Sequence, residues 1–290
     1  MPCFHPITAY HKLGGGITWN YRESNGIKLT VSCKQCTGCR QEYARQWAMR
    51  NIHEASLWLN NIFITLTYND QNLPQHNTLV KKHFTDFMKR LRFEKGSNKK
   101  NPIRFFHCGE YGEKFGRPHY HAILFNTNFD DRTPIPGQKN LTTSEQLKRL
   151  WGKGHVSIGD VTFQSASYVA GKVKKKDHYR RIDKTTGETW VLQQEYATMS
   201  RRPGIAGLWF AKYKKDIFPR DSLHINGIDT KPCNYYLNLF KEQEPEIHKI
   251  VKENRLKDMK HTAHLRTPQA LAQAKRNHQA RMSLYKRGKL

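Results

Sequence analysis

Apolar residues recur along the chain at spacings that predict helices. Phe84, Phe87, Met88 and Leu91 follow the i, i+3, i+4, i+7 pattern of one helix face, so a helix is predicted over residues 81–93. Further helices are predicted over 41–58, 143–151, 165–175 and, with interruptions at Pro245 and Pro268, from 237 onward. Helices are thus expected along much of the chain, separated by segments with a different pattern.

Short apolar runs rich in β-branched and aromatic residues predict strands. These runs cover 27–31, 62–68, 103–111, 119–125 and 156–163. Because the loop 112–118 is rich in glycine and turn-forming residues, the strands on either side of it should pair antiparallel. The charged segment 176–196 is expected to be a loop. The strands and helices alternate without a Gly-rich βαβ fingerprint, so we expect an α+β sandwich, a central antiparallel sheet flanked by helices.

The pattern also divides the chain into three parts. Residues 1–40 form a Cys-rich N-terminal segment, 41–236 hold the predicted sheet, and 237–290 form a basic helical tail. Within that tail, residues 241–290 contain 13 Lys and Arg against 5 Asp and Glu. Such an excess is typical of a solvated arm. The two terminal parts are therefore expected to be additions to one sheet-containing domain.

The charge of the whole chain points to a polyanionic partner. The 50 Lys and Arg against 24 Asp and Glu give a formal net charge of +26, an excess that indicates nucleic acid more readily than an anionic membrane surface. No apolar run approaches the length of a membrane span. The N-terminus MPCFHPITAY lacks the pattern of a signal peptide. Secretion and membrane insertion are therefore not expected.

The predicted strand 119–125 opens with a pair of histidines. Residues i and i+2 of a strand share a face, so His119 and His121 can direct two imidazoles at one ion. Glu110, at the end of the preceding strand, would lie across from His119 in an antiparallel pair. Two imidazoles and a carboxylate suit Mg²⁺, Mn²⁺ or another divalent ion that must also hold a phosphate oxygen. The alternative is a pair of structural histidines.

A second pair with chemical potential lies on the helix predicted to open at Ser165, its expected N-cap. Tyr168 and Lys172 are at i and i+4, on the side opposite the apolar stripe that begins at Ala166. A tyrosine hydroxyl, with a pKa near 10, needs an activated target or a nearby cation to act as a nucleophile. The alternative is an exposed tyrosine on a basic helix. Together with the histidines, this pair describes a DNA-nicking transesterase.

Four cysteines form a candidate metal site near the N-terminus. Cys33, Cys36 and Cys39 follow C-x-x-C-x-x-C, and Cys3 can supply a fourth thiolate. A tetrahedral Zn²⁺ site would tether the N-terminal segment to the following helix. An iron–sulfur cluster is a second interpretation, although Tyr43 stands where a ferredoxin run has its next cysteine. Free thiols are the third.

Five separated stretches, spread over roughly residues 1–240, resemble the replication initiators of single-stranded DNA phages of the gokushovirus branch of the Microviridae. The stretches are Cys33–Arg50 (CKQCTGCRQEYARQWAMR), Phe63–Asp70 (FITLTYND), Ile103–Phe125 (IRFFHCGEYGEKFGRPHYHAILF), Ile158–Lys176 (IGDVTFQSASYVAGKVKKK) and Met199–Phe210 (MSRRPGIAGLWF). Within them, G-E-Y-G-E-K-x-G-R-P-H-Y-H and M-S-R-R-P-G-I are the most specific motifs.

The resemblance implies an HUH endonuclease, named for the His-hydrophobe-His pair, on an RRM-like sandwich. It implies that a metal held by His119, His121 and the upstream acid Glu110 polarises a phosphate of origin DNA. It further implies that Tyr168 attacks this phosphate and stays joined to the 5′ end, which starts rolling-circle replication. Related initiators often carry a second tyrosine four residues after the first, where this chain has Lys172.

Several further expectations follow from the charge and the resemblance. The candidate DNA contacts are Lys174, Lys175, Lys176, Arg201 and Arg202; for the two arginines a solvated turn is the alternative. The expected partners are single-stranded DNA at the phage origin and host replication proteins, in the cytoplasm of the infected bacterium. A DNA-binding protein without catalysis and a metal-dependent phosphohydrolase without a covalent intermediate remain the alternative functions.

Overall fold

The structure is a computed structural model of the 290-residue chain, and it describes residues 3–112, 115–171, 180–182, 185–225 and 227–284. The chain divides into two compact units. We call Ala44–Leu239 the central unit, and Met1–Tyr43 with Phe240–Leu290 the terminal unit. Each is described separately.

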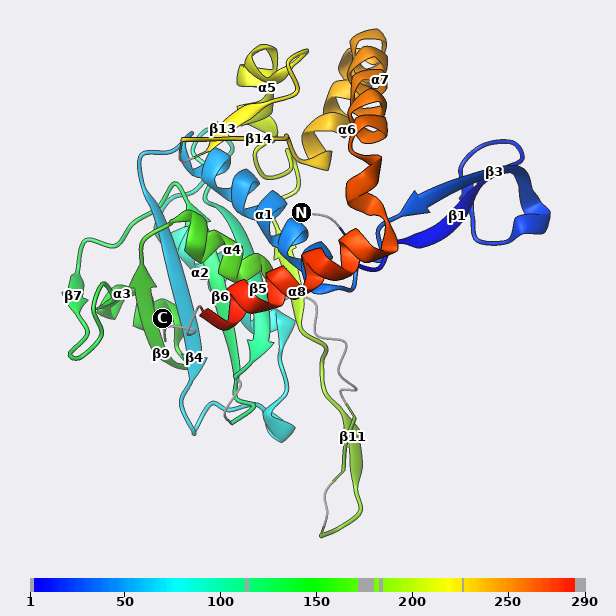
Figure 1. Ribbon diagram of the computed structural model, residues 1–290. Helices are drawn as coiled ribbons and strands as arrows, with labels where there is room; N and C mark the ends of the chain where they lie inside the picture. Colours follow the sequence, from blue (N-terminus) through cyan, green and yellow to red (C-terminus); the bar gives the residue numbers. More distant parts are fainter. Residues whose placement is uncertain (1–2, 113–114, 172–179, 183–184, 226, 285–290) are drawn as a thin grey trace. The chain divides into compact units, whose positions relative to one another are not determined.

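The central unit is built on a seven-stranded antiparallel sheet with strand order β12-β5-β6-β4-β9-β8-β7 (Figure 1). Its strands are β4 (Asn61–Tyr68), β5 (Arg104–Tyr111), β6 (Pro118–Phe125), β7 (Arg132–Pro134), β8 (Thr142–Ser144), β9 (Gly154–Gly159) and β12 (Tyr196–Met199). All pairs are antiparallel. The predicted α+β class, with a central antiparallel sheet flanked by helices, is therefore confirmed.

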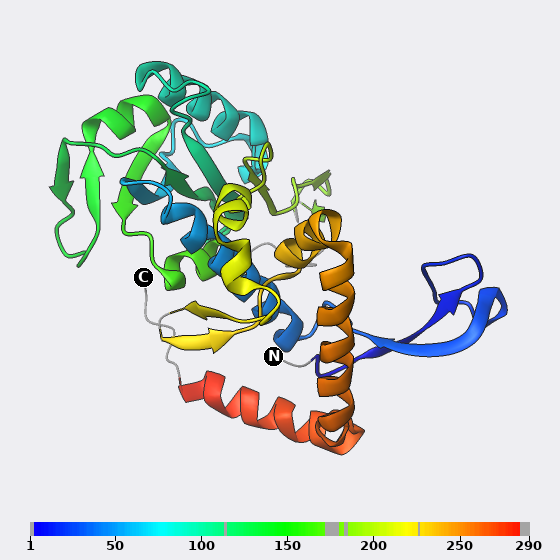
Figure 2. The ribbon, with the colours of Figure 1, turned by 90° about the horizontal axis from the view of Figure 1, so that it is seen from above.

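Helices cover the two faces of this sheet (Figure 2). On one face, Ile62, Leu66 and other apolar residues of β4 pack against α2 (Lys81–Glu94) and α3 (Glu145–Trp151). On the other face, α4 (Phe163–Gly171) and the part of α1 (Thr37–Ala55) from Ala44 onward cover one end of the strands. Burial of each large apolar side chain stabilises such a core by about 1.5–3 kcal/mol. The uncovered end of this second face carries the polar residues of the candidate site.

The predicted helices are present in the described residues; residues 172–175 of the helix expected over 165–175 lie outside them. Three differences from the prediction concern the starts of α3 and α4 and the end of β9. The helix expected over 143–151 begins at Glu145, and residues 143 and 144 belong to β8 (Thr142–Ser144). The Ser144 side chain caps α3 by accepting a hydrogen bond from the Leu147 amide. The strand expected over 156–163 ends at Gly159. The expected N-cap at Ser165 is wrong, because Thr162 is the cap. The Thr162 hydroxyl accepts from the Ser165 amide, and the Ser165 hydroxyl accepts from the Thr162 amide.

The segment 176–196, expected as a loop, contains strand structure in its described part. β10 (Arg180–Ile182) and β11 (Thr189–Val191) form a two-stranded pair. Tyr196 begins β12, which pairs with β5 at Gly109. A Cβ at Gly109 would lie 2.9 Å from the Tyr196 ring, so the missing side chain makes room for Tyr196. The strand β12 therefore forms because it pairs with β5, and the residues of 196–199 alone do not predict it.

The remaining elements of the central unit follow the sheet. They are α5 (Gly207–Ile217), β13 (Leu223–Ile225), β14 (Ile228–Thr230), most of α6 (Asn234–Gln243) and the short 3₁₀ helix Gln75–Asn77. Residues 201–206 before α5 form a turn, where the motif SRRPGIAG predicts one over 200–207.

The terminal unit joins the two ends of the chain. It holds β1 (Ile7–Lys12), β2 (Ile17–Thr18), β3 (Ser24–Val31), α7 (Pro245–His261), α8 (Pro268–Leu284) and the 3₁₀ helices Tyr21–Glu23 and Ala263–Arg266. The helices α7 and α8 begin at Pro245 and Pro268, the prolines expected to interrupt the tail. At the first position of a helix the missing N–H of proline breaks no hydrogen bond. The Phe4 ring packs 5.4 Å from that of His278 on α8. In the described part of the chain, none of the helices has the length and apolar character needed to cross a bilayer.

Candidate active site

Strand pairing brings the three predicted ligands together. In the antiparallel β5–β6 pair, Glu110 lies opposite His119, as expected, and Cys108 lies opposite His121. Because His119 and His121 are two residues apart on β6, both side chains lie on the same sheet face as Glu110. This is the face whose other end is covered by α1 and α4.

The two imidazoles converge on one carboxylate oxygen. His119 Nε2 lies 2.9 Å and His121 Nε2 lies 3.2 Å from Oε1 of Glu110. Each second ring nitrogen has its own partner: His119 Nδ1 lies 3.1 Å from the Arg117 carbonyl, and His121 Nδ1 lies 2.9 Å from the Thr65 hydroxyl. Such outer contacts fix the ring orientation and leave Nε2 to act as a metal ligand.

The electrostatics keep the carboxylate in its ligand form. Burial of Glu110 raises its pKa, but hydrogen bonds from His119 and His121 and their charges lower it more, so the net pKa lies well below the usual value. An ionised carboxylate is the form that binds a cation. The three ligand atoms lie within 4.8 Å of one another. The donor set therefore fits a divalent metal ion with coordination positions left open.

The helix α4 places a tyrosine beside this set of ligands. The Tyr168 hydroxyl lies 3.4 Å from Oε1 of Glu110, and its ring meets that of His121 edge to face at 5.1 Å and 81°. The helix is held by Ala166 and Val169, which are fully buried against the sheet. Tyr168 is accordingly half-buried at the site rather than exposed on a solvated helix. Of the other residues predicted near it, Lys172, Lys174, Lys175 and Lys176 lie outside the described residues.

Three contributors to the site were not predicted from the sequence. Thr65, on β4, holds His121, and the Phe63 ring stacks parallel to the His121 imidazole at 5.6 Å. A signal for Thr65 exists in the stretch FITLTYND, where threonines alternate with buried apolar residues and so share one face of a strand. Arg117, which precedes the histidines, bonds the Tyr68 carbonyl and pairs with Asp70 at 2.7 Å. No spacing pattern could have identified that contact.

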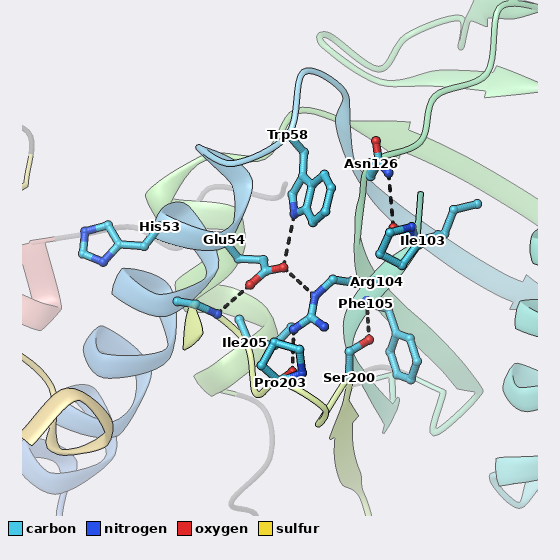
Figure 3. Close-up of polar contacts among 12 residues, drawn as sticks. His53, Glu54, Trp58, Ile103, Arg104, Phe105, Asn126, Ser200, Pro203 and Ile205 are labelled. Carbon is cyan, nitrogen blue, oxygen red and sulfur yellow. Dashed lines mark hydrogen bonds and ion pairs between the residues drawn. The ribbon is translucent and has the colours of Figure 1, made fainter. Parts of the chain in front are cut away.

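A buried ion pair between Glu54 and Arg104 (Figure 3) anchors the turn over residues 201–206. This turn carries Arg201 and Arg202, the predicted DNA contacts. Arg104 Nε lies 2.6 Å from Glu54 Oε1 in a site that excludes solvent from both side chains. Arg104 also donates to the Pro203 carbonyl at 2.7 Å, and Glu54 accepts from the Ala206 amide at 2.6 Å and from the Trp58 indole at 3.2 Å. Neither Glu54 nor Arg104 was singled out from the sequence.

Arg50 also holds the backbone of this turn, in addition to Arg104 and Glu54. Arg50 donates two hydrogen bonds to the Ile205 carbonyl, at 3.1 and 3.0 Å. The side chains of Arg201 and Arg202 are exposed on the same turn. The predicted DNA-contact arginines therefore project from a backbone that is fixed in place.

The terminal unit brings the four predicted cysteines together. The Cys3 and Cys33 sulfurs are 3.5 Å apart, and the Cys33–Cys39 and Cys3–Cys36 pairs are each 3.9 Å apart. A tetrahedral zinc site with bonds of about 2.3 Å separates its sulfurs by about 3.8 Å. All four sulfurs lie within 4.8 Å of one another. This spacing fits a single metal ion better than a larger iron–sulfur cluster, whose thiolates surround several iron atoms.

Backbone amides favour the thiolate form of Cys36 in this cluster. The Phe4 amide donates to the Cys36 sulfur at 3.4 Å, and the Cys33 amide donates to the Cys3 sulfur at 3.2 Å. Burial raises the pKa of Cys36, but hydrogen bonds from the Cys39 and Phe4 amides lower it to about 6. A thiolate is the form that binds metal.

Comparisons with known proteins agree with the motifs. A family model described as Replication-associated protein ORF2/G2P matches residues 61–177, which include the three candidate ligands and Tyr168. The replication-associated protein VP4 of Bdellovibrio phage phiMH2K is 33% identical over 266 residues, covering 85% of this chain and 79% of the relative. No solved structure matches the chain.

Two further relatives are similarly related. The replication-associated protein ORF2 of Spiroplasma virus 4 is 33% identical over 78% of this chain and 75% of its own length. The replication-associated protein ORF4 of Chlamydia phage 1 is 32% identical over 54% of this chain and 41% of its own length. The chain therefore belongs to the replication-associated proteins of the Microviridae, the phage family whose initiators its sequence motifs resemble.

Proposed function

We propose that the protein is an HUH-type endonuclease that nicks and joins single-stranded DNA at a phage origin and so starts rolling-circle replication. One observation carries the proposal. The Tyr168 hydroxyl lies 3.4 Å from the Glu110 oxygen on which His119 and His121 converge. A nucleophile thus lies within reach of a phosphate held at that point.

The proposed reaction is a transesterification at a single phosphorus. The Tyr168 oxygen forms a bond to the phosphorus as the bond to the 3′ oxygen breaks. The hydroxyl proton ends on the 3′ oxygen, so the products are a free 3′-OH and a 5′-phosphotyrosine. Reversal of the step by another 3′-OH rejoins the strand. Glu110, His119 and His121 would hold Mg²⁺ or Mn²⁺, which supplies charge stabilisation at the phosphate.

The remaining charge of the chain suits a DNA substrate. Arg201 and Arg202 are exposed on an anchored turn, and we assign them to phosphate contacts. We assign the same role to Lys174, Lys175 and Lys176, and to Lys172 the stabilisation of charge near Tyr168. The reaction belongs in the cytoplasm of the infected host cell, where host replication proteins extend the free 3′-OH.

We assign a structural role to the four cysteines. A Zn²⁺ ion held by Cys3, Cys33, Cys36 and Cys39 would tie residue 3 to the start of α1, within the terminal unit. The sulfur spacing of 3.5–3.9 Å supports this assignment.

One assay tests the catalytic proposal against both alternatives. The full-length protein is incubated with single-stranded DNA of its phage origin and Mn²⁺ or Mg²⁺, then run on a denaturing gel. A protein–DNA adduct that resists denaturation is expected. Binding without cleavage would instead identify a non-catalytic DNA-binding protein, and cleavage without an adduct would identify a phosphohydrolase.

A further inference from the structure

The sheet face that carries the candidate ligands continues across two more strands. Thr67 on β4 pairs with His119 on one side and with His155 of β9 on the other, and Thr65 lies in the same way between His121 and Ser157. Cross-strand partners lie on the same face, about 4.8 Å apart from strand to strand. A band of polar side chains therefore runs from the ligands towards β9.

Side chains of this band line a hollow of about 420 Å³. Its wall is formed by β4, β9 and the segment from Ile135 to Lys148, and its polar lining includes Thr67, Gln138, Lys148, His155 and Ser157. The volume falls in the range of roughly 300–1,000 Å³ that small organic ligands occupy. The hollow begins beside Thr65, whose hydroxyl contacts the imidazole of His121. It therefore lies next to the candidate active site.

Three polar side chains of the lining are available to a ligand. Gln138, His155 and Ser157 have no side-chain hydrogen bond to any other described residue. Together they offer an amide, an imidazole and a hydroxyl, each able to donate or accept. Ile135 adds apolar contact in the same hollow. A planar ring with hydrogen-bonding edges matches this combination.

The charge of the hollow distinguishes a base from a phosphate. Its charged lining residues are Lys148 and Glu145, whose side chains lie 3.4 Å apart and offset each other. A phosphate subsite would need an excess of cations, which the chain has in abundance elsewhere. The hollow thus favours a neutral polar group, although the chain as a whole carries a charge of +26.

We infer that this hollow receives the base of a nucleotide next to the scissile phosphate and reads its identity. The inference rests on the proposed nicking function, because that function places a DNA phosphate at Glu110, His119 and His121. Bases of single-stranded nucleic acid can be splayed out and recognised by their hydrogen-bonding edges. His155 and Gln138 are then specificity-determining residues for the origin sequence.

The test combines protein variants with an abasic scan. Single abasic sites are placed at each position around the nick, and both kcat/KM and equilibrium binding are measured for the wild-type protein and for a His155→Ala/Gln138→Ala double variant. In the wild type, one position next to the nick should show a loss of roughly tenfold. In the double variant, the same abasic site should cause little additional loss. His261→Ala, at an exposed position of the terminal unit, is the control and should leave the penalty unchanged.

The outcomes separate this inference from the proposed function. An equal abasic penalty in the wild type and the double variant at every position overturns the base subsite. If the wild-type protein forms no adduct, the nicking function fails. The binding arm still decides the subsite in that case, since coupling between the abasic position and the two substitutions does not require cleavage. Both side chains are exposed at the surface, so the double variant should fold, and circular dichroism checks this.

Discussion

At the scale of single residues, the geometry of the candidate site depends on the partners of the two Nδ1 atoms as much as on the histidines and Glu110 themselves. The Nε2 atoms of His119 and His121 both face Glu110, because a backbone carbonyl holds one Nδ1 and the Thr65 hydroxyl holds the other. Free imidazoles could turn either nitrogen inward. The two hydrogen bonds select the arrangement in which three ligand atoms converge.

Thr65→Val therefore tests positioning without changing a ligand. Valine keeps the shape and packing of threonine but removes the hydroxyl that contacts His121 Nδ1. Loss of such an outer contact typically weakens metal affinity about 10–100-fold, and we expect a weakening in this range for Mn²⁺, measured by calorimetry on the full chain. Thr65→Ser should restore the affinity. An unchanged Mn²⁺ affinity in the valine variant would contradict the positioning role.

Tyr168→Phe separates chemistry from binding. The substitution removes one oxygen and keeps the ring against His121, so the fold, Mn²⁺ affinity and DNA binding should survive while the covalent adduct disappears. Tyr21→Phe is a matched control, because Tyr21 is 65% exposed in the terminal unit, and it should leave the adduct intact. Mass spectrometry of the digested wild-type adduct should locate the nucleotide on Tyr168. A nucleotide on another tyrosine would show that the nucleophile is assigned incorrectly.

At the scale of elements, a helix or strand could be predicted from the sequence where its own residues determine it, and not where a distant part of the chain does. The helix around Phe84 and the strands around His119 carry their own periodicity, and the antiparallel β5–β6 pair brought Glu110 opposite His119 as predicted. β12 was missed because its partner, β5, supplies the pairing from far along the chain. The start of α4 was displaced from Ser165 to Phe163 because two side chains share the cap. Glu54 and Arg104 find each other only in the folded chain.

Glu54→Gln should reveal how much the fold depends on this buried pair. The substitution leaves the Arg104 charge without its counter-ion in a site closed to solvent, which typically costs about 3–5 kcal/mol of unfolding free energy. Urea unfolding of the variant should show a loss of this size. The double variant Glu54→Leu/Arg104→Met, with both charges removed, should recover part of it. A single variant as stable as the wild type would mean that the pair does not anchor the turn.

The proposed zinc site of the four cysteines should protect the terminal unit from proteolysis. Elemental analysis of the purified protein should give about one zinc per chain, and Cys33→Ser/Cys36→Ser should lose it. Because Cys3 would no longer be tied to the start of α1, limited proteolysis should cut the variant faster within residues 3–36. Cys233→Ser, at a cysteine outside the cluster, should keep the zinc. Iron in place of zinc, or no metal in the wild type, would contradict the assignment.

At the scale of the whole molecule, the charge should govern DNA affinity. Each phosphate that the protein neutralises on a single strand contributes about −0.7 to the slope of log K against log salt. With a net charge of +26, we expect a steep slope for origin DNA, measured by fluorescence anisotropy between low and moderate salt. Base contacts in the hollow beside β9 would add a part of the affinity that salt changes little.

The anchored turn makes this expectation specific. Replacing Arg201 and Arg202 together by alanine should reduce the magnitude of the slope by about 1.4, because two phosphate contacts at about 0.7 each are lost. Arg50, Glu54 and Arg104 hold the backbone of the turn, so the double variant should keep the wild-type unfolding free energy. An unchanged slope would mean that Arg201 and Arg202 lie on a solvated turn and contact no phosphate. An affinity that does not vary with salt in the wild type would contradict binding through phosphates altogether.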